Sequence, residues 1–223
     1  MTERRFDATE LVIFDCDGVL LDSEVIACSA DAEALTKAGY QISTAEVIER
    51  FAGVPADAMY AAIEADLGRP LPSNLQAEVK ASILARYRSE LRAIVGAAEV
   101  LSAMRTRRCV ASSSAPAKLA LGLIETNLFD LLYPHVFSTT LVAQGKPHPD
   151  IFLYAARAME VGRERCLVVE DSVAGVTAAK AAGMRCIGFV GGSHCPDGHA
   201  KRLSEAGATT VVSDLRQLMT FVD

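Results

Sequence analysis

The sequence predicts an α/β fold in which a doubly wound parallel sheet carries an inserted helical module. Three observations favour this class: short aliphatic runs recur along the chain, helical stretches separate most of them, and one long interval is helical throughout. With 223 residues, the chain can form one large α/β domain with an insertion and bury a sizeable core.

Six aliphatic runs are short enough to be buried strands. In chain order, these runs are 11–14, 109–111, 136–137, 166–169, 186–190 and 209–212. The helical stretches that separate most of them are 97–104, 118–125, 150–159 and 172–182. This alternation predicts a parallel sheet with helices on both faces.

The interval from about residue 23 to residue 91 breaks the alternation, because it contains helix-like runs and no convincing strand. Helices are expected there over 25–38, 44–51, 56–67 and 74–88. Gly39, Gly53, Gly68 and the prolines at 70 and 72 mark helix ends and turns. We therefore expect an α/β core formed by residues 1–22 and 92–223, with residues 23–91 as a helical cap.

Composition argues against several classes of protein. The net charge is −6 and the basic residues are scattered, which disfavours a nucleic-acid groove or a polybasic membrane anchor. The first ten residues lack an apolar leader, and no apolar stretch is long enough to span a bilayer. The six cysteines are dispersed without a CxxC pair, as is typical of reduced thiols. We expect a cytoplasmic protein, monomeric or weakly homodimeric, that binds neither nucleic acid nor membrane.

Chemically reactive side chains follow the predicted strands. In an open parallel sheet, ligands bind beyond the carboxyl ends of the strands, so these side chains are expected to meet at one edge. They are Asp15 and Asp17 after the first run, Ser112 to Ser114 after the second, Lys146 before a later helix, and Glu170 with Asp171 after the fourth run.

The four acidic residues in this set predict a metal site. Asp15 and Asp17 lie two positions apart on an extended segment, so they project to the same side, and Gly18 lets the chain turn away. Facing Glu170 and Asp171, they would repel one another unless a hard cation lay between them. Ligands that are all oxygen atoms suit Mg²⁺.

The same residues could together transfer a phosphoryl group. Asp15 would attack phosphorus. Asp17 would protonate the leaving oxygen and later activate water, which requires a pKa well above the ordinary value of about 3.9. Ser112, with nearby backbone N–H groups such as that of Ser113, would hold a phosphate oxygen, and Lys146 would neutralise charge.

Each residue alone has a structural explanation. A single Asp after a strand is commonly a helix cap or turn residue, and the serines could cap the helix near Pro116. Lys146 could be a solvated surface residue, and the acidic pair could cap the helix that starts near residue 172. It is their combination at successive strand ends that favours a catalytic site.

Four segments resemble the motifs of the haloacid dehalogenase superfamily. LVIFDCDGVLLDSE resembles the first motif, and Val110-Ala111-Ser112 resembles the second. The third and fourth look like GKPHPD at 145–150 and VVEDSVAGVTAAKAAG at 168–183. The resemblance implies a Rossmann-like core of strand order 5-4-1-2-3 with a helical cap after the first motif. It also implies roles for five residues. Asp15 would be the nucleophile, and Asp17 would be the general acid/base and would bind the metal through its backbone carbonyl. Ser112 and Lys146 would bind phosphate, and Asp171 would bind the metal.

Members of this branch include sugar-phosphate phosphatases such as 6-phosphogluconate phosphatases, phosphoglycolate phosphatases, dehalogenases and β-phosphoglucomutases. Dehalogenases do not keep the second aspartate, so Asp17 and Asp171 argue against that chemistry. The mutases carry a His where Ala27 stands and a K-G-x-x-R run at residues 52–56, where this chain reads AGVPA. Losing these side chains favours hydrolysis over a mutase reaction. The leading hypothesis is a phosphatase that acts on a small phosphorylated sugar or sugar acid. The substrate itself stays open.

Two hypotheses from other classes were weighed. A signalling receiver module also accepts phosphate on an aspartate, but such modules are about half this length and have no helical insertion at this point. A silent binding protein would retain only a vestigial site, whereas every core catalytic residue is present here.

Two loops outside the strand ends were also considered. The loop around Gly53 is expected to close over the substrate. The segment that contains His194, Cys195 and His199 invites a metal-site interpretation, but it lacks a fourth ligand at zinc-like spacing and is more typical of a flexible polar loop. Such a loop could instead approach the mouth of the active site.

Overall fold

A six-stranded, all-parallel sheet forms the centre of the protein. The structure is a computed structural model that describes residues 9–51, 54 and 56–222. Its strands are β1 (Leu11–Phe14), β2 (Arg107–Ser112), β3 (Val136–Ser138), β4 (Cys166–Glu170), β5 (Arg185–Phe189) and β6 (Thr210–Val212). All six predicted aliphatic runs are therefore strands.

The strands lie in the order β3-β2-β1-β4-β5-β6. This contains the five-strand order that the family resemblance implied and adds β6 at the edge beside β5. Phe14, at the end of β1, pairs with Val110 on β2 and with Val169 on β4. Because the three strands are parallel and in this register, the residues after Phe14 lie beside the ends of β2 and β4.

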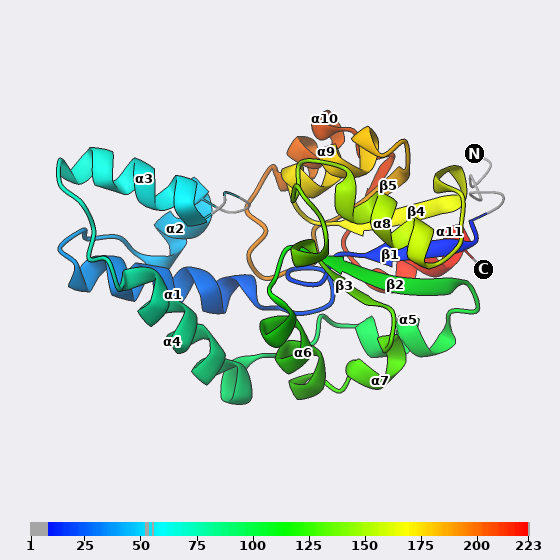
Figure 1. Ribbon diagram of the computed structural model, residues 1–223, viewed down its shortest axis with the longest axis horizontal. Helices are drawn as coiled ribbons and strands as arrows, with labels where there is room; N and C mark the ends of the chain where they lie inside the picture. The colour runs from blue at the N-terminus through cyan, green and yellow to red at the C-terminus, as the bar shows by residue number, and fades with distance from the viewer. Residues whose placement is uncertain (1–8, 52–53, 55, 223) are drawn as a thin grey trace.

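Helices cover both faces of the sheet (Figure 1). One apolar layer, which includes Val12 and Phe14, packs under α5 (Ala97–Ala103), α6 (Pro116–Glu125) and α7 (Phe129–Leu132). The opposite layer includes Leu11 and Ile13 and packs under α8 (Asp150–Ala158), α9 (Val173–Ala181) and α10 (His199–Ala206). Alternate residues of β1 thus enter two separate cores, as expected for a strand buried on both faces.

Short elements complete the core. Three are 3₁₀ turns: η1 (Thr139–Leu141), η2 (Arg163–Arg165) and η3 (Leu215–Leu218). The short helix α11 (Met219–Val222) ends the described chain. The sequence did not predict these turns, α7 or α11, because elements of three or four residues carry too few apolar positions to show a period. It did not predict α10 either, because Leu203 is the one large apolar residue in that helix.

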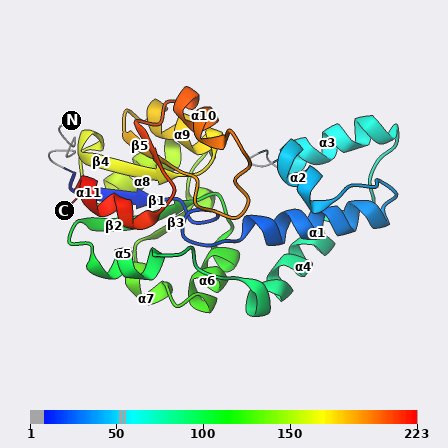
Figure 2. The same cartoon turned by 180° about the vertical axis from the view of Figure 1, so that it is seen from behind.

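The interval that breaks the strand–helix alternation forms four helices, as predicted. They are α1 (Glu24–Lys37), α2 (Thr44–Phe51), α3 (Ala56–Leu67) and α4 (Leu75–Glu90). They project to one side of the sheet (Figure 2). Their own apolar core contains Leu35, Val47 and Ile63. In the described part of the chain, no helix has the length and apolar character needed to cross a membrane.

Candidate active site

Asp15, the residue directly after β1, lies in a buried contact with Lys146. Lys146 Nζ donates to Asp15 Oδ1, to Glu170 Oε1 at 2.7 Å and to the carbonyl of Ala111 at 3.0 Å. Lys146 precedes α8, and its side chain is only 5% exposed. One ammonium group therefore joins the ends of β1, β2 and β4, and the predicted meeting of Asp15, Lys146 and Glu170 occurs.

The charges at this point do not balance. Burial raises the pKa of Asp15 well above its ordinary value, and Lys146 opposes this while Glu170 and Asp171 add to it. Burial alone would lower the pKa of Lys146, but Asp15 and Glu170 outweigh it and raise that pKa. Lys146 contacts two carboxyl groups, and the nearby Asp171 adds a third negative charge that acts on Asp15. An additional cation would help to keep Asp15 ionised.

Asp17 lies in a second network that faces the inserted helices. Its Oδ1 accepts hydrogen bonds from Ser23 Oγ at 2.6 Å, Lys118 Nζ at 3.1 Å and the Tyr87 hydroxyl at 3.2 Å. Its Oδ2 accepts from Ser114 Oγ. Ser23 precedes α1 and Tyr87 lies on α4, whereas Ser114 and Lys118 lie at the start of α6. Both sides of the boundary between core and insertion therefore bind the same carboxylate.

The expected raised pKa of Asp17 is wrong for this arrangement. Burial alone would raise the pKa, but Lys118 and the hydrogen bonds from Ser114 and Ser23 outweigh it and lower the pKa of Asp17 to about 2. The expectation followed from what acid/base catalysis requires, and the hydrogen-bond donors around Asp17 could not be seen in the sequence. With these partners, Asp17 is held as a carboxylate.

The serines after β2 have different surroundings. Ser112 is buried, and its Oγ accepts a hydrogen bond from the backbone N–H of Ser114 at 3.0 Å. Ser113 is exposed, and its carbonyl accepts from Thr139 Oγ1 at 3.3 Å. Ser112 and Ser113 thus lie at the end of β2, next to Ala111, whose carbonyl accepts from Lys146. Their role as phosphate binders stays a prediction. Gly53, the predicted cap residue, lies outside the described residues.

Glu170 and Asp171 contact different partners. Glu170 Oε1 accepts from Lys146, and Oε2 accepts from the backbone N–H of Ser172 at 2.8 Å and its hydroxyl at 2.9 Å. Asp171 Oδ2 lies 2.9 Å from His194 Nε2. Both oxygens of Glu170 are therefore occupied by protein donors, which differs from the direct metal ligand predicted from sequence.

Three oxygen atoms at the site are left as candidates to hold a divalent cation. No described residue donates a hydrogen bond to Asp15 Oδ2, to Asp171 Oδ1 or to the backbone carbonyl of Asp17. Among residues 9–51, 54 and 56–222, no three His, Cys, Asp or Glu side chains are grouped to hold a metal. Two carboxylates with one carbonyl suit Mg²⁺, which keeps several of its waters in protein sites.

Gly18 makes the close approach of Asp171 possible. Its φ is +79°, and a Cβ at this position would lie 1.9 Å from Asp171 Oδ2. Any other residue would therefore be strained and would displace the carboxylate. This contact places Asp171 against the turn that carries Asp15 and Asp17.

Four residues that sequence reasoning gave no role lie at this site: Lys118, Tyr87, Glu24 and His194. Lys118 follows Ser114 by four residues, a helical spacing that could have pointed to it. Burial, followed by the charge of Asp17, raises the pKa of Glu24 to about 7. Tyr87 is 70 positions from Asp17 and has no local signal.

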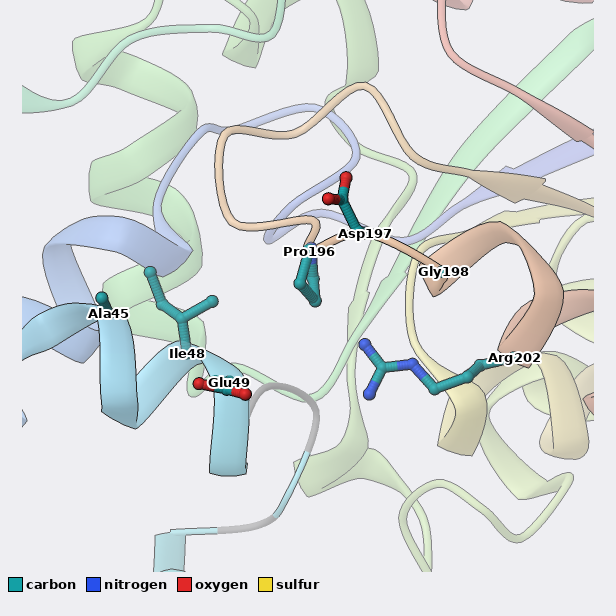
Figure 3. A pocket seen from close by; sticks show the side chains of 7 residues that line it. All are labelled: Ala45, Ile48, Glu49, Pro196, Asp197, Gly198 and Arg202. Atoms are coloured by element: carbon teal, nitrogen blue, oxygen red, sulfur yellow. The ribbon is translucent and has the colours of Figure 1, made fainter.

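A cavity of about 530 Å³ lies near these networks, between α2 and the segment that leads into α10. Figure 3 shows Ile48 of α2 and Arg202 of α10 reaching in from opposite sides. Its lining also includes Glu49, Pro196 and Asp197. None of the strand-end residues lines it. His199, whose ring contacts the backbone carbonyl of Asp171, directly follows Gly198 of the lining.

Comparison with known proteins agrees with this geometry. The family model described as haloacid dehalogenase-like hydrolase matches residues 9–183. The chain belongs to this family. The hydrolase is 34% identical over 202 residues to 6-phosphogluconate phosphatase of Escherichia coli K12, covering 90% of this chain and 89% of that relative. It is 30% identical over 207 residues to a phosphorylated carbohydrates phosphatase of Thermotoga maritima, covering 91% and 94%.

A crystal structure of a haloacid dehalogenase-like protein from Agrobacterium tumefaciens is also similar to this hydrolase. The two share 42% identity with a TM-score of 0.88, over 94% of this chain and 96% of the other. The predicted resemblance to the haloacid dehalogenase superfamily is confirmed.

Proposed function

We propose that this hydrolase is a Mg²⁺-dependent phosphatase that acts on a small phosphorylated sugar or sugar acid through an aspartyl-phosphate intermediate on Asp15. The observation that carries the proposal is the contact of Lys146 with Asp15 and Glu170 at the ends of β1 and β4. A buried cation beside a buried carboxylate provides both a nucleophile and a positive charge for the phosphoryl oxygens.

Two chemical steps account for the reaction. A carboxylate oxygen of Asp15 attacks phosphorus and the phosphorus–oxygen bond to the substrate alcohol breaks. Asp17, which has first taken up a proton, gives it to the departing oxygen. Asp17 then takes a proton from water, whose oxygen attacks phosphorus, releases inorganic phosphate and regenerates Asp15. Ser112 and the backbone N–H of Ser113 bind the phosphoryl oxygens, and Lys146 neutralises their charge.

Mg²⁺ would be held by Asp15, by Asp171 and by the backbone carbonyl of Asp17. When bound, it would supply charge neutralisation at the phosphoryl group. Glu170 would act on the site through Lys146.

The contacts of Asp17 connect the proton transfer with the inserted helices. Ser23, directly before α1, and Tyr87, on α4, each donate a hydrogen bond to Asp17. Lys118 and Ser114, which lower the pKa of Asp17 more than Ser23 does, belong to the core side of this network. Loss of the Ser23 donor on a displacement of α1 would therefore raise the pKa of Asp17, while Lys118 and Ser114 would still lower it. The insertion would then serve as a cap that adjusts the acid/base residue.

The substrate class rests on the relatives and on the insertion. Both phosphatase relatives carry names that refer to phosphorylated sugars or sugar acids. A mutase would need charged side chains at residues 27 and 52–56 to hold a second phosphate group. This chain lacks them. Hydrolysis is therefore favoured over a phosphomutase reaction.

A panel of phosphorylated metabolites tests this proposal. The purified chain is expected to release inorganic phosphate from at least one sugar phosphate or sugar-acid phosphate with Mg²⁺, and to lose this activity with a chelator or as Asp15→Asn. Asp130→Asn, a change at an exposed aspartate of α7, serves as the matched control. Isomerisation of a hexose phosphate without phosphate release would instead identify a mutase, and inactivity toward the entire panel would contradict the proposal.

A further inference from the structure

The loop between β5 and α10 is anchored at the active site. Ser193 donates from its backbone N–H to Asp22 Oδ1 at 3.0 Å and from its hydroxyl to Asp22 Oδ2. Asp22 follows the turn that carries Asp15 and Asp17. The loop expected to be flexible therefore contacts the segment after β1.

Two buried histidines from this region contact Asp171. His194 is 5% exposed, and its Nε2 lies 2.9 Å from Asp171 Oδ2. His199 Nε2 lies 2.5 Å from the backbone carbonyl of Asp171 and donates to it. One imidazole thus binds the side chain of Asp171 and the other its backbone.

The space around His194 is closely fitted. A Cβ added to Gly192 would lie 2.7 Å from the Nδ1 and Cε1 atoms of the ring, and one added to Gly18 would lie 2.9 Å from Cε1. His194 Nδ1 is buried and has no hydrogen-bond partner among the described residues. A buried nitrogen without a hydrogen-bond partner is unfavourable in free energy, and an apolar ring at this position would avoid that cost. What an imidazole provides here and an apolar ring does not is the contact with Asp171.

We propose that His194 is a positioning residue that holds one oxygen of Asp171 so that the other oxygen faces a divalent cation shared with Asp15. This inference rests on the proposed Mg²⁺-dependent function and assigns a role to a loop outside the four motifs. The Nε2–H group binds Oδ2, and no described residue binds Oδ1. Fixing the first oxygen fixes the direction of the second, as hydrogen-bond partners of metal-bound carboxylates do.

Alternative uses of the imidazole are less consistent with these contacts. A direct metal ligand would present a nitrogen lone pair to the ion, whereas Nε2 is directed at a carboxylate oxygen. A zinc site would need the donor atoms of His194, Cys195 and His199 to converge. Cys195 Sγ lies 3.7 Å from His194 Nε2, but His199 Nε2 is bound to a backbone carbonyl. His194 is therefore assigned to the aspartate and not to a second metal site.

Calorimetric titration of the full chain with MgCl₂, without substrate, tests the inference. His194→Phe keeps a ring and removes the N–H group, so its dissociation constant for Mg²⁺ is expected to rise about 10- to 100-fold. His194→Gln places an amide N–H at a similar reach and is expected to restore most of the affinity. His135→Phe, at an exposed histidine, is the matched control and should bind Mg²⁺ like the unchanged chain.

Gly192→Ala provides a second test that leaves the imidazole in place. The added methyl group would displace the His194 ring, so Mg²⁺ affinity should fall in the same direction as for His194→Phe. Circular dichroism and the melting temperature in chelator establish that each variant is folded.

The outcomes separate the two proposals. Mg²⁺ affinity within twofold of the unchanged value in both folded His194→Phe and Gly192→Ala would overturn the role of His194 alone. Absence of Mg²⁺ binding by the unchanged chain would overturn both this inference and the proposed function.

Discussion

Lys146 Nζ lies 2.7 Å from Glu170 Oε1, in a contact that is almost completely buried. Glu170 is fixed in turn by the backbone and hydroxyl of Ser172. The acidic residue at the end of β4 therefore determines where the lysine meets Asp15. The charge and burial of Glu170 and the register of β4 thus together fix the position of Lys146 against Asp15.

Replacing Glu170 with Gln should weaken catalysis while it preserves the shape of the site. The amide can still accept a hydrogen bond from Lys146, but the negative charge that fixes the ammonium is lost. We expect kcat/KM for phosphate release to fall about 10- to 100-fold, as is usual when a partner of a functional group is removed. Steady-state kinetics measures this, and an unchanged kcat/KM would contradict the role of Glu170.

Gly175→Ala should displace the same carboxylate without changing any charge. Gly175 lies in the first turn of α9, and a Cβ there would lie 1.7 Å from Glu170 Oε1. Because Glu170 would have to move, we expect lower kcat/KM together with a lower melting temperature. Val173→Ala, at an exposed position of the same turn, is the control and should change neither quantity substantially. If Gly175→Ala had the same kcat/KM and melting temperature as Val173→Ala, the position of Glu170 would not matter for catalysis, which would contradict this prediction.

Glu24 should make folding stability depend on pH. Burial and the charge of Asp17 raise its pKa to about 7, and Asp171 adds to this while Lys118 and His194 oppose it. The folded state therefore retains a proton that the unfolded state loses near pH 4.5, and stability from this group falls as pH rises from about 4.5 to 7.

Glu24→Gln should remove this dependence, since an amide does not titrate. The difference in melting temperature between Glu24→Gln and the unchanged chain is expected to shift in favour of the variant between pH 5 and pH 8. This shift corresponds to about 3 kcal/mol at most in the free energy of unfolding. Exposed Glu90→Gln should show no such difference. Parallel melting curves of the unchanged chain and Glu24→Gln at both pH values would refute the raised pKa.

Lys118 and Asp17 should be energetically coupled. Their side chains are 27% and 15% exposed, and Lys118→Met would leave the Asp17 carboxylate partly buried without its cation. We expect a loss of about 1–3 kcal/mol in the free energy of unfolding at pH 7. Because the pKa of Asp17 is lowered to about 2, its contribution is present above its ordinary pKa and disappears as pH falls toward 2.

A double-mutant cycle with Asp17→Asn measures this coupling by urea unfolding. The double variant should lose less than the sum of the two single losses, because each change removes the same ion pair. Lys80→Met, at an exposed lysine of α4, should have little effect. Additive losses would contradict the coupling.

The fold could be predicted from the sequence because its signals are local. Each aliphatic run is continuous, and a parallel sheet brings the residues after such runs to one edge. This is why Asp15 and Glu170 could be placed beside Lys146 without coordinates. The partners of Asp17 could not be predicted in this way, because Tyr87 and Lys118 reach it from two different helices. The sign of its pKa shift depends on counting those donors.

The burial of His194 and its contact with Asp171 could not be predicted for a related reason. The glycines and polar residues of its loop are typical of a mobile turn, and only the packing of the loop against Gly18 and Asp171 makes His194 buried. Burial created by contacts between distant segments leaves no periodic pattern in the sequence.

Rapid-quench trapping of the intermediate tests the central claim most directly. The enzyme is mixed with the best substrate and Mg²⁺, stopped within one turnover and treated with borohydride, which reduces an aspartyl phosphate to homoserine. Peptide mass spectrometry is expected to find homoserine at position 15, and none in an enzyme sample without substrate. Turnover of substrate with position 15 remaining aspartate in every quenched sample, or homoserine at a different position, would contradict nucleophilic catalysis by Asp15.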